Sequence, residues 1–115
     1  MLTEDYVRQA KITRWVDGDT VDVLIDLGFN ISLAERVRVL GLNCREVTGA
    51  EKQFGLLDKA HAEELIPVGT TVVFQSHKSK DKDKYGRWLA AILMNDGTVF
   101  ADRMIRDGHG RVATY

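Results

Sequence analysis

Alternating hydrophobic and polar residues dominate the first third of the chain. Apolar-rich segments occupy residues 6–16, 20–27 and 31–40. An Asp-Gly-Asp triplet at 17–19 and a Gly-Phe-Asn triplet at 28–30 separate them, and both suit tight turns. In the third segment the hydrophobic residues share one parity and the arginines the other, as in a strand with one buried face. The pattern predicts three consecutive strands that form a meander.

The next segment changes to a helical period. Residues 49–65 carry apolar or aromatic side chains at near-helical spacing, which predicts a helix. Its expected inner face consists of Phe54, Leu57, His61 and Leu65. Thr48 and Glu51 match a capping box at its start, and Pro67 ends it.

The last third predicts two further strands and a short helix. The expected elements are a strand at 70–76, a charged loop at 78–84, a strand at 88–94 that is apolar on both parities, a turn at 95–97 and a helix at 100–106 closed by Gly108. No element is expected in the tail at 111–115. Three strands, a helix, two strands and a helix fit a mainly β (α+β) fold, a five-stranded OB-type Greek-key barrel with two helices.

Composition and charge narrow the class of protein. The chain has 115 residues, of which 44% are hydrophobic and 29% charged, which favours a single domain over residues 1–115. The formal net charge is −1, so no global basic field attracts nucleic acid. An anionic ligand would therefore need cations that cluster locally.

Cysteine usage and the N-terminus indicate a compartment. Cys44 is the only cysteine, so an intramolecular disulfide is excluded and a reducing environment is favoured. The acidic N-terminus lacks the layout of a signal peptide, and no apolar run has membrane-spanning length. We expect a cytoplasmic protein with no membrane partner, although a secreted protein whose signal peptide has been removed would show the same pattern.

The candidate chemistry lies in residues 37–46, Val-Arg-Val-Leu-Gly-Leu-Asn-Cys-Arg-Glu. Arg38 occupies the predicted third strand, and Asn43 and Glu46 follow its end within a few residues. A cation and two oxygen-bearing side chains at the exit of one strand could serve one phosphate site.

Each of these features also has an ordinary structural interpretation. A strand arginine such as Arg38 is more often part of a cross-strand salt pair, and an Asp-Gly-Asp triplet is more often only a turn. Arg87 could be a solvated cation beside the charged loop. Cys44 has no histidine motif beside it, which argues against a thiol nucleophile.

The joint order of the motifs carries more information than any one of them. Asp-Gly-Asp-Thr, a strand arginine, Asn-Cys-Arg-Glu and Asp-Lys-Tyr-Gly-Arg follow one another between Lys11 and Ala113. This order closely resembles the staphylococcal (thermonuclease-like) nuclease family. The resemblance implies an OB-type barrel and an endonuclease, a metal-binding hydrolase that uses calcium to cleave DNA and RNA and leaves 3′-phosphate ends.

The resemblance also implies a calcium site and a general base. Asp19 matches a calcium ligand of the family. Asn43 stands where the family usually has a second aspartate ligand, and Cys44 stands where a backbone carbonyl binds the metal. Glu46 matches the glutamate that acts as general base.

The substrate contacts implied by the resemblance are to phosphates. Arg38 and Arg87 match two phosphate-binding arginines, and Lys84 and Tyr85 match positions that touch a neighbouring phosphate. An arginine fork donates two hydrogen bonds to phosphate oxygens and stays charged, so removal of either arginine is expected to cost about 3–4 kcal/mol of transition-state stabilisation. The partner expected from these contacts is single-stranded DNA or RNA.

Three departures from the family pattern bear on activity. Asn43 lacks the charge of the usual aspartate, which predicts weaker calcium binding. Arg45 replaces a proline, and it could hold substrate phosphate or pair with Glu46. Thr114 stands where the family often has a nucleotide-contacting tyrosine, and the further helix common in the family does not follow, so a homodimer could cover the apolar surface left exposed.

Two other classes of function compete with the nuclease. A non-catalytic OB module that binds nucleic acid is mildly favoured by Asn43 and Arg45. The joint presence of Arg38, Glu46 and Arg87 argues against it, because a pure binder needs no base beside a metal site. A protein-interaction domain has no positive feature in the sequence.

Overall fold

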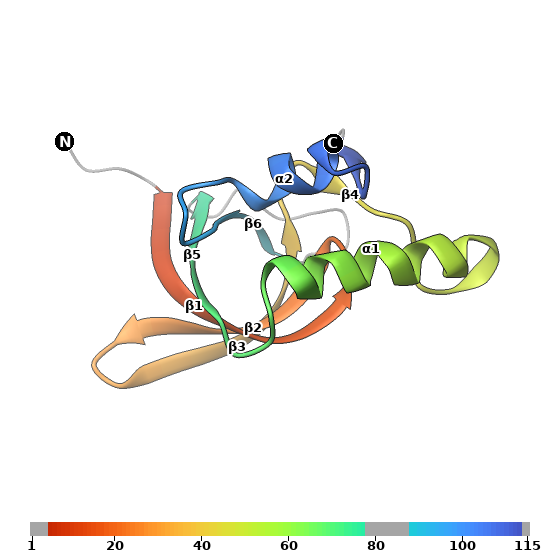
Figure 1. The fold of residues 1–115 in the computed structure, drawn as a ribbon. Helices are drawn as coiled ribbons and strands as arrows, with labels where there is room; N and C mark the ends of the chain where they lie inside the picture. Colours follow the sequence, from red (N-terminus) through yellow and green to blue (C-terminus); the bar gives the residue numbers. More distant parts are fainter. Residues whose placement is uncertain (1–4, 78–87, 114–115) are drawn as a thin grey trace.

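Five strands close into a barrel in the computed structural model, which describes residues 5–77 and 88–113 (Figure 1). The elements are β1 (Asp5–Asp17), β2 (Thr20–Gly28), β3 (Ile31–Val39), β4 (Leu42–Asn43), a 3-10 turn (Gly49–Glu51), α1 (Lys52–Leu65), β5 (Thr71–His77), β6 (Trp88–Leu93), α2 (Phe100–Arg106) and β7 (Arg111–Val112). The order around the barrel is β1-β2-β3-β6-β5, with β5 paired back to β1. The β3–β6 pair is parallel, and the other pairs in the barrel are antiparallel. The predicted OB-type barrel with two helices is confirmed.

The long strand β1 buries side chains of both parities, because its pairing with β2 shifts register twice. Ala10 and Ile12 are buried with one parity. The pairing with β2 shifts between Ile12 and Arg14 and again between Trp15 and Asp17, so Trp15 is buried with the opposite parity. Such bulges bend a strand and increase its twist, which a small barrel needs in order to close.

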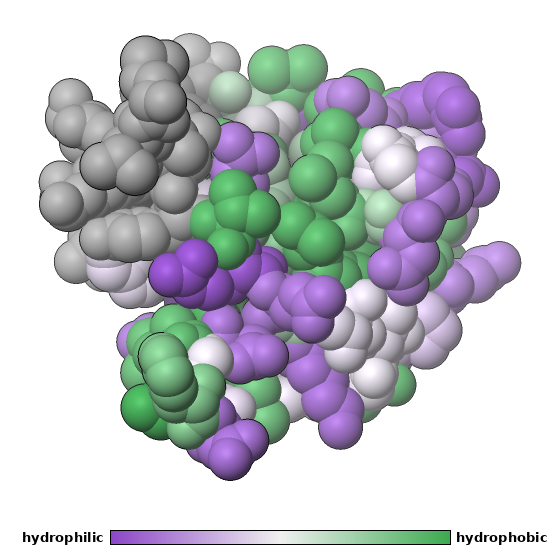
Figure 2. Space-filling view, turned by 90° about the vertical axis from the view of Figure 1, so that its left-hand side faces the viewer, coloured by the Kyte–Doolittle hydropathy of each residue, from purple (hydrophilic) through white to green (hydrophobic). Residues whose placement is uncertain are grey.

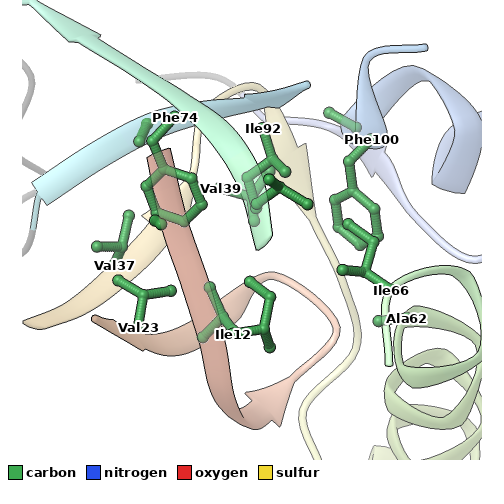
Figure 3. Packing of buried hydrophobic residues seen from close by; sticks show 14 of the residues in the cluster. Ile12, Val23, Val37, Val39, Ala62, Ile66, Phe74, Ile92 and Phe100 are labelled. Atoms are coloured by element: carbon green, nitrogen blue, oxygen red, sulfur yellow. The ribbon is translucent and has the colours of Figure 1, made fainter. Parts of the chain in front are cut away.

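The core fills the barrel and continues beneath the helices. Inside the barrel, as Figure 3 shows, lie side chains that include Ile12, Val23, Val37, Val39, Phe74 and Ile92. At the end of the barrel covered by the helices, the Trp15 indole Nε1 donates to the Ile66 carbonyl at 2.9 Å. The Trp15 ring also lies 5.1 Å from the Phe100 ring, centroid to centroid. These contacts join β1 to the C-terminal end of α1 and to α2.

The β2–β3 hairpin extends past the barrel (Figure 1). Val37 and Val39 in the C-terminal half of β3 are buried, but Ile31 and Leu33 in its outer half are exposed. The predicted half-buried strand is therefore confirmed only where β3 pairs with β6 as well as β2. Phe29 at the tip of the hairpin is 95% exposed. Figure 2 shows that hydrophobic surface also lies among the polar side chains on the face of the molecule turned to the viewer.

The predicted inner face of α1 is wrong at Phe54 and Leu57, whereas Leu65 packs against the core as predicted. Phe54 and Leu57 are about half exposed, whereas the buried side of the helix carries Gly55, Asp58 and Ala62. The periodicity of apolar residues misses this face because it consists of small residues and one carboxylate. The capping box is also wrong: the side chain of Thr48 makes no capping hydrogen bond, and a 3-10 turn precedes the helix.

The C-terminal segment has more structure than the sequence predicted. Helix α2 has the predicted bounds, and Gly108 ends it with a φ of 82°. The N–H groups of Gly108 and His109 donate to the carbonyls of Ile105 and Met104, which is the Schellman arrangement. The chain then forms β7, which pairs with β4. In the parts of the chain that the structure describes, no helix is long and apolar enough to cross a membrane.

Candidate active site

The pairing of β2 with β3 places Arg38 beside the Asp-Gly-Asp turn. Arg38 is the partner of Thr20, the first residue of β2, and the Val39 N–H donates to the Asp19 carbonyl at 2.8 Å. Just past β3, Gly41 adopts a φ of 80°, which turns the chain into β4. The antiparallel register therefore brings together segments that are about 20 positions apart in the sequence.

Asp19 is a buried carboxylate with defined partners. Its Oδ2 accepts a hydrogen bond from the Cys44 N–H at 2.7 Å, and its Oδ1 accepts one from the Thr20 hydroxyl at 3.1 Å. The Arg38 Nη2 lies 3.6 Å from the same Oδ2. The structure thus brings Asp19, Arg38 and Cys44 into one cluster.

The Arg38 guanidinium makes only part of the hydrogen bonds that it can donate. Its Nη2 donates to the Asn43 Oδ1 at 2.9 Å and to the Leu42 carbonyl at 3.3 Å. Its Nε is buried and has no hydrogen-bond partner within the described residues. An unsatisfied buried donor is costly, and a phosphate oxygen is an acceptor that would remove this cost.

The neighbouring arginine of β3 shows the ordinary role of a strand arginine. Arg36 lies opposite Asp22 on β2 and binds it through two hydrogen bonds, of 2.8 Å and 3.2 Å. This cross-strand pair lowers the pKa of Asp22. A cross-strand salt pair, the ordinary role considered for Arg38 from the sequence, is therefore the role of Arg36.

A second carboxylate lies beside Asp19. Burial, followed by the hydrogen bond and charge of Asp19, raises the pKa of Asp17 to about 7. The Asp17 Oδ1 also accepts the Asp19 N–H at 3.3 Å. Two carboxylates this close resist a second negative charge, so Asp17 keeps its proton up to about pH 7, and a cation bound beside the pair would favour its loss.

The donor types fit a hard cation such as calcium, which takes oxygen ligands. Asp19 offers a carboxylate oxygen, Asn43 an amide oxygen and Cys44 a backbone carbonyl, while Asp17 adds negative charge above about pH 7, where it loses its proton. Among the described residues no group of three or more His, Cys, Asp or Glu side chains is arranged to hold a metal ion. A cation at this cluster would therefore depend on amide and carbonyl oxygens and on water for the rest of its coordination.

The Cys44 thiol is held in its protonated form. Burial raises its pKa, and the charges of Asp19 and Asp58 raise it further, so the thiol stays protonated. The Sγ donates to the His109 carbonyl at 3.2 Å. These contacts agree with the absence of a cysteine–histidine motif in the sequence.

Arg45 binds a partner that the sequence did not indicate. Its Nε and Nη2 donate to the two carboxylate oxygens of Asp58 at 2.9 Å and 2.6 Å, and its backbone N–H donates to Asp58 Oδ2 at 3.1 Å. The His109 Nδ1 lies 3.0 Å from Asp58 Oδ1. Neither interpretation of Arg45, as a phosphate contact or as a partner of Glu46, anticipated this pair.

Two histidines continue this cluster toward α2. The rings of His61 and His109 stack, with centroids 4.3 Å apart. The His61 Nε2 lies 2.8 Å from Asp107 Oδ2, which also accepts a hydrogen bond from Arg103 at 2.8 Å. His61 is thus a packed histidine, as expected.

Asp58 and His109 are the residues of this cluster that the sequence did not indicate. The only signal for Asp58 is its spacing from Gly55 and Ala62, which places the three residues on one face of the helix.

Of the other residues predicted for the site, the structure describes only Glu46. Glu46 lies three residues after Asn43, with an exposed side chain, and its backbone carbonyl packs directly against Gly55 of α1. The other predicted substrate contacts, Lys84, Tyr85 and Arg87, lie outside the described residues.

The OB-type barrel, with a guanidinium, carboxylates and an amide gathered near the start of β2 and the end of β3, has a nuclease-like fold. The family model described as staphylococcal nuclease homologue matches residues 36–115, and the chain belongs to this family. The match includes Arg38, Asn43 and Glu46, whereas Asp19 precedes it. Members of the family are generally hydrolytic nucleases.

The chain is also similar to a protein of Methanocaldococcus jannaschii, uncharacterized protein MJ1439. The two sequences are 27% identical over 125 aligned positions, which cover 90% of this chain and 58% of the relative. The chain thus spans little more than half the length of this relative.

Proposed function

We propose that the protein is a calcium-dependent endonuclease that hydrolyses phosphodiester bonds of DNA and RNA and leaves 3′-phosphate ends. The observation that carries the proposal is the Arg38 guanidinium, which is held beside Asp19 and Asn43 while its buried Nε lacks a partner among the described residues. A guanidinium placed this way at the end of a barrel suits a phosphate better than it suits a structural ion pair.

Arg38 and Arg87 have the role of neutralising the substrate. A phosphodiester is anionic and repels an attacking hydroxide, so charge that develops on its oxygens must be stabilised by fixed donors. Arg38 is oriented by Asn43 and by the Leu42 carbonyl, which limits its movement when the substrate binds. Neither arginine acts as the proton donor to the leaving oxygen, because a guanidinium hardly deprotonates near neutral pH.

Glu46 is the proposed general base. A carboxylate can take a proton from the water that attacks phosphorus, and it must be free of strong ion pairs to do so. Arg45, the adjacent cation, is bound to Asp58, which leaves the Glu46 carboxylate without this neighbour as a competing partner.

Calcium would be held by Asp19, Asn43 and the Cys44 carbonyl. When bound, it would supply positive charge to the phosphate and lower the pKa of water in the site. The amide of Asn43 also accepts a hydrogen bond from Arg38, so this side chain links the proposed metal ligands to the proposed phosphate contact.

Sequence specificity should be low, because contacts to phosphates carry no direct information about base identity. Single-stranded DNA or RNA is the proposed substrate, with Lys84 and Tyr85 as further phosphate contacts. The second candidate function is a nucleic-acid-binding module with weakened catalysis, which is favoured by the neutral amide at Asn43 in place of a carboxylate.

Arg38→Ala tests the proposal against a matched control. We expect kcat/KM on single-stranded DNA to fall by a factor equivalent to about 3–4 kcal/mol, because the variant removes a transition-state donor. Arg36→Ala removes a cation of the same strand and parity whose hydrogen-bond partner among the described residues is Asp22, so it should keep most of the activity. Equal losses in the two variants would show that Arg38 has no special role.

A further inference from the structure

Asp58 is a carboxylate on α1 whose side chain is only 1% exposed. Its two oxygens receive hydrogen bonds from the Arg45 N–H, Nε and Nη2 and face the His109 Nδ1. Burial alone would raise the pKa of Asp58, but the hydrogen bonds from Arg45 and His109 outweigh it and hold the pKa below its usual value. A buried carboxylate with this many partners is fixed in position.

One of these partners is the main chain of the loop between β4 and α1. The Arg45 N–H binds Asp58, and the N–H of the preceding residue, Cys44, binds Asp19. Two buried carboxylates from different elements therefore hold two successive amides of this loop. A side-chain ion pair alone would leave the backbone free to shift.

The third consecutive residue of the loop is held by packing. The Glu46 carbonyl lies against Gly55 of α1 so closely that a Cβ at Gly55 would collide with it. Gly18 has the same role on the other side, because a Cβ there would lie 2.8 Å from the Cys44 Sγ and 3.3 Å from the Asp58 Cβ. The two glycines allow α1 and the turn before β2 to close on the loop.

We propose that Asp58 is a positioning residue that holds the segment from Asn43 to Glu46 in the geometry required for catalysis. The inference rests on the proposed function, because this segment carries the proposed metal ligands and the proposed base. Asp58 touches neither substrate nor metal and acts through Arg45. A misplacement of about 1 Å in such a segment can lower a rate about 100-fold.

Asp58→Asn keeps the shape of the side chain and removes its charge. We expect kcat to fall about 10- to 100-fold while KM for single-stranded DNA changes little, because the phosphate contact at Arg38 is retained. Asp107→Asn is the matched control: it removes a carboxylate that binds His61 and Arg103 and lies 3.8 Å from Arg106, with no contact to the loop among the described residues. A purely structural role of Asp58 would predict similar kcat values for both variants at a temperature at which both are folded.

Amide hydrogen exchange provides a second readout that does not require turnover. In Asp58→Asn the amides of Cys44 and Arg45 should exchange about tenfold faster or more, while amides within the barrel keep their rates. If the wild type does not cleave DNA, the proposed function fails, and this measurement still decides whether Asp58 holds the loop. Unchanged exchange at Cys44 and Arg45 would overturn the inference.

A double-mutant cycle tests whether Asp58 acts through Arg45. If it does, Arg45→Ala combined with Asp58→Asn should lose no more activity than the more damaging single variant. If the fold-losses of activity in the two single variants multiply in the double variant, Asp58 does not act through Arg45. Arg45→Ala, at a side chain 33% exposed, removes the two side-chain hydrogen bonds to Asp58 and keeps the backbone one. If Asp58→Asn fails to fold, this variant tests the support of the loop, with a smaller expected rise in the exchange rates of the amides at positions 44 and 45, and unchanged rates would overturn the inference.

Discussion

Two arginines on the same face of β3 have different surroundings. Arg36 binds a cross-strand aspartate through two hydrogen bonds, whereas Arg38 has a threonine opposite it and shares its Nη2 between an amide and a backbone carbonyl. Sequence alone favours the same ordinary role for both. The difference depends on which residue the register places opposite each arginine, and on the fold of the segment that follows β3.

At the residue scale, Asn43→Asp should strengthen calcium binding. The substitution adds a formal negative charge next to Asp19, and calcium affinity rises with the charge of its ligands. We expect the dissociation constant measured by isothermal titration to fall about tenfold. Equal affinities would show that the side chain at this position is not a ligand.

Asp17 makes stability depend on pH. Its pKa rises from 3.8 to about 7 on folding, so between these values the folded protein holds a proton that the unfolded chain releases. The contribution of Asp17 to the free energy of unfolding therefore falls as the pH rises from 3.8 to about 7. Above about pH 7 the full destabilisation by the buried charge is reached.

Asp17→Asn should remove this dependence. We expect the variant to be more stable than the wild type by about 1–3 kcal/mol at pH 8 and equal to it near pH 4, since part of the shift is shared with Asp19. Urea unfolding in the presence of a chelator at both pH values measures the difference. A gain of the same size at both would rule out an origin in the charge of Asp17.

At the element scale, α1 shows where sequence periodicity fails. The position and length of this helix were predictable, because an apolar period and a following proline mark it. Its orientation was not, because the fully buried residues of the helix are a glycine, an aspartate and an alanine, none of which counts as a hydrophobic anchor. Phe54 remains exposed beneath the Arg45 guanidinium, which lies 5.0 Å from the centre of its ring.

The glycine of this face gives a test that opposes intrinsic helix propensity. At an open site in a helix, Gly→Ala stabilises a protein by about 1 kcal/mol. At Gly55 the added Cβ meets the Glu46 carbonyl, so we expect Gly55→Ala to lower the free energy of unfolding by about 1–3 kcal/mol. Glu63→Ala, at an exposed position of α1, should stay within about 0.5 kcal/mol of the wild type in the same urea titration. A stabilised Gly55→Ala variant would contradict the close packing.

At the scale of the whole molecule, the order of elements was enough to predict the barrel. Strand order and turn residues allow few topologies, and the OB arrangement is one that joins three strands, a helix and two strands without crossings. The β4–β7 pair was missed because each strand has two residues, too few for any periodicity. Asp58 was missed for a related reason, since its partners Arg45 and His109 lie 13 and 51 positions away in the sequence.

The central claim is that this barrel is a nuclease whose base is Glu46. A gel assay on single-stranded DNA, with calcium and with chelator, should compare the wild type with Glu46→Gln prepared in the same way. We predict cleavage that requires calcium and that Glu46→Gln abolishes. DNA that is retarded but left uncut by the wild type would contradict the claim and favour the binding module. Equal cleavage by the two proteins would contradict the role of Glu46.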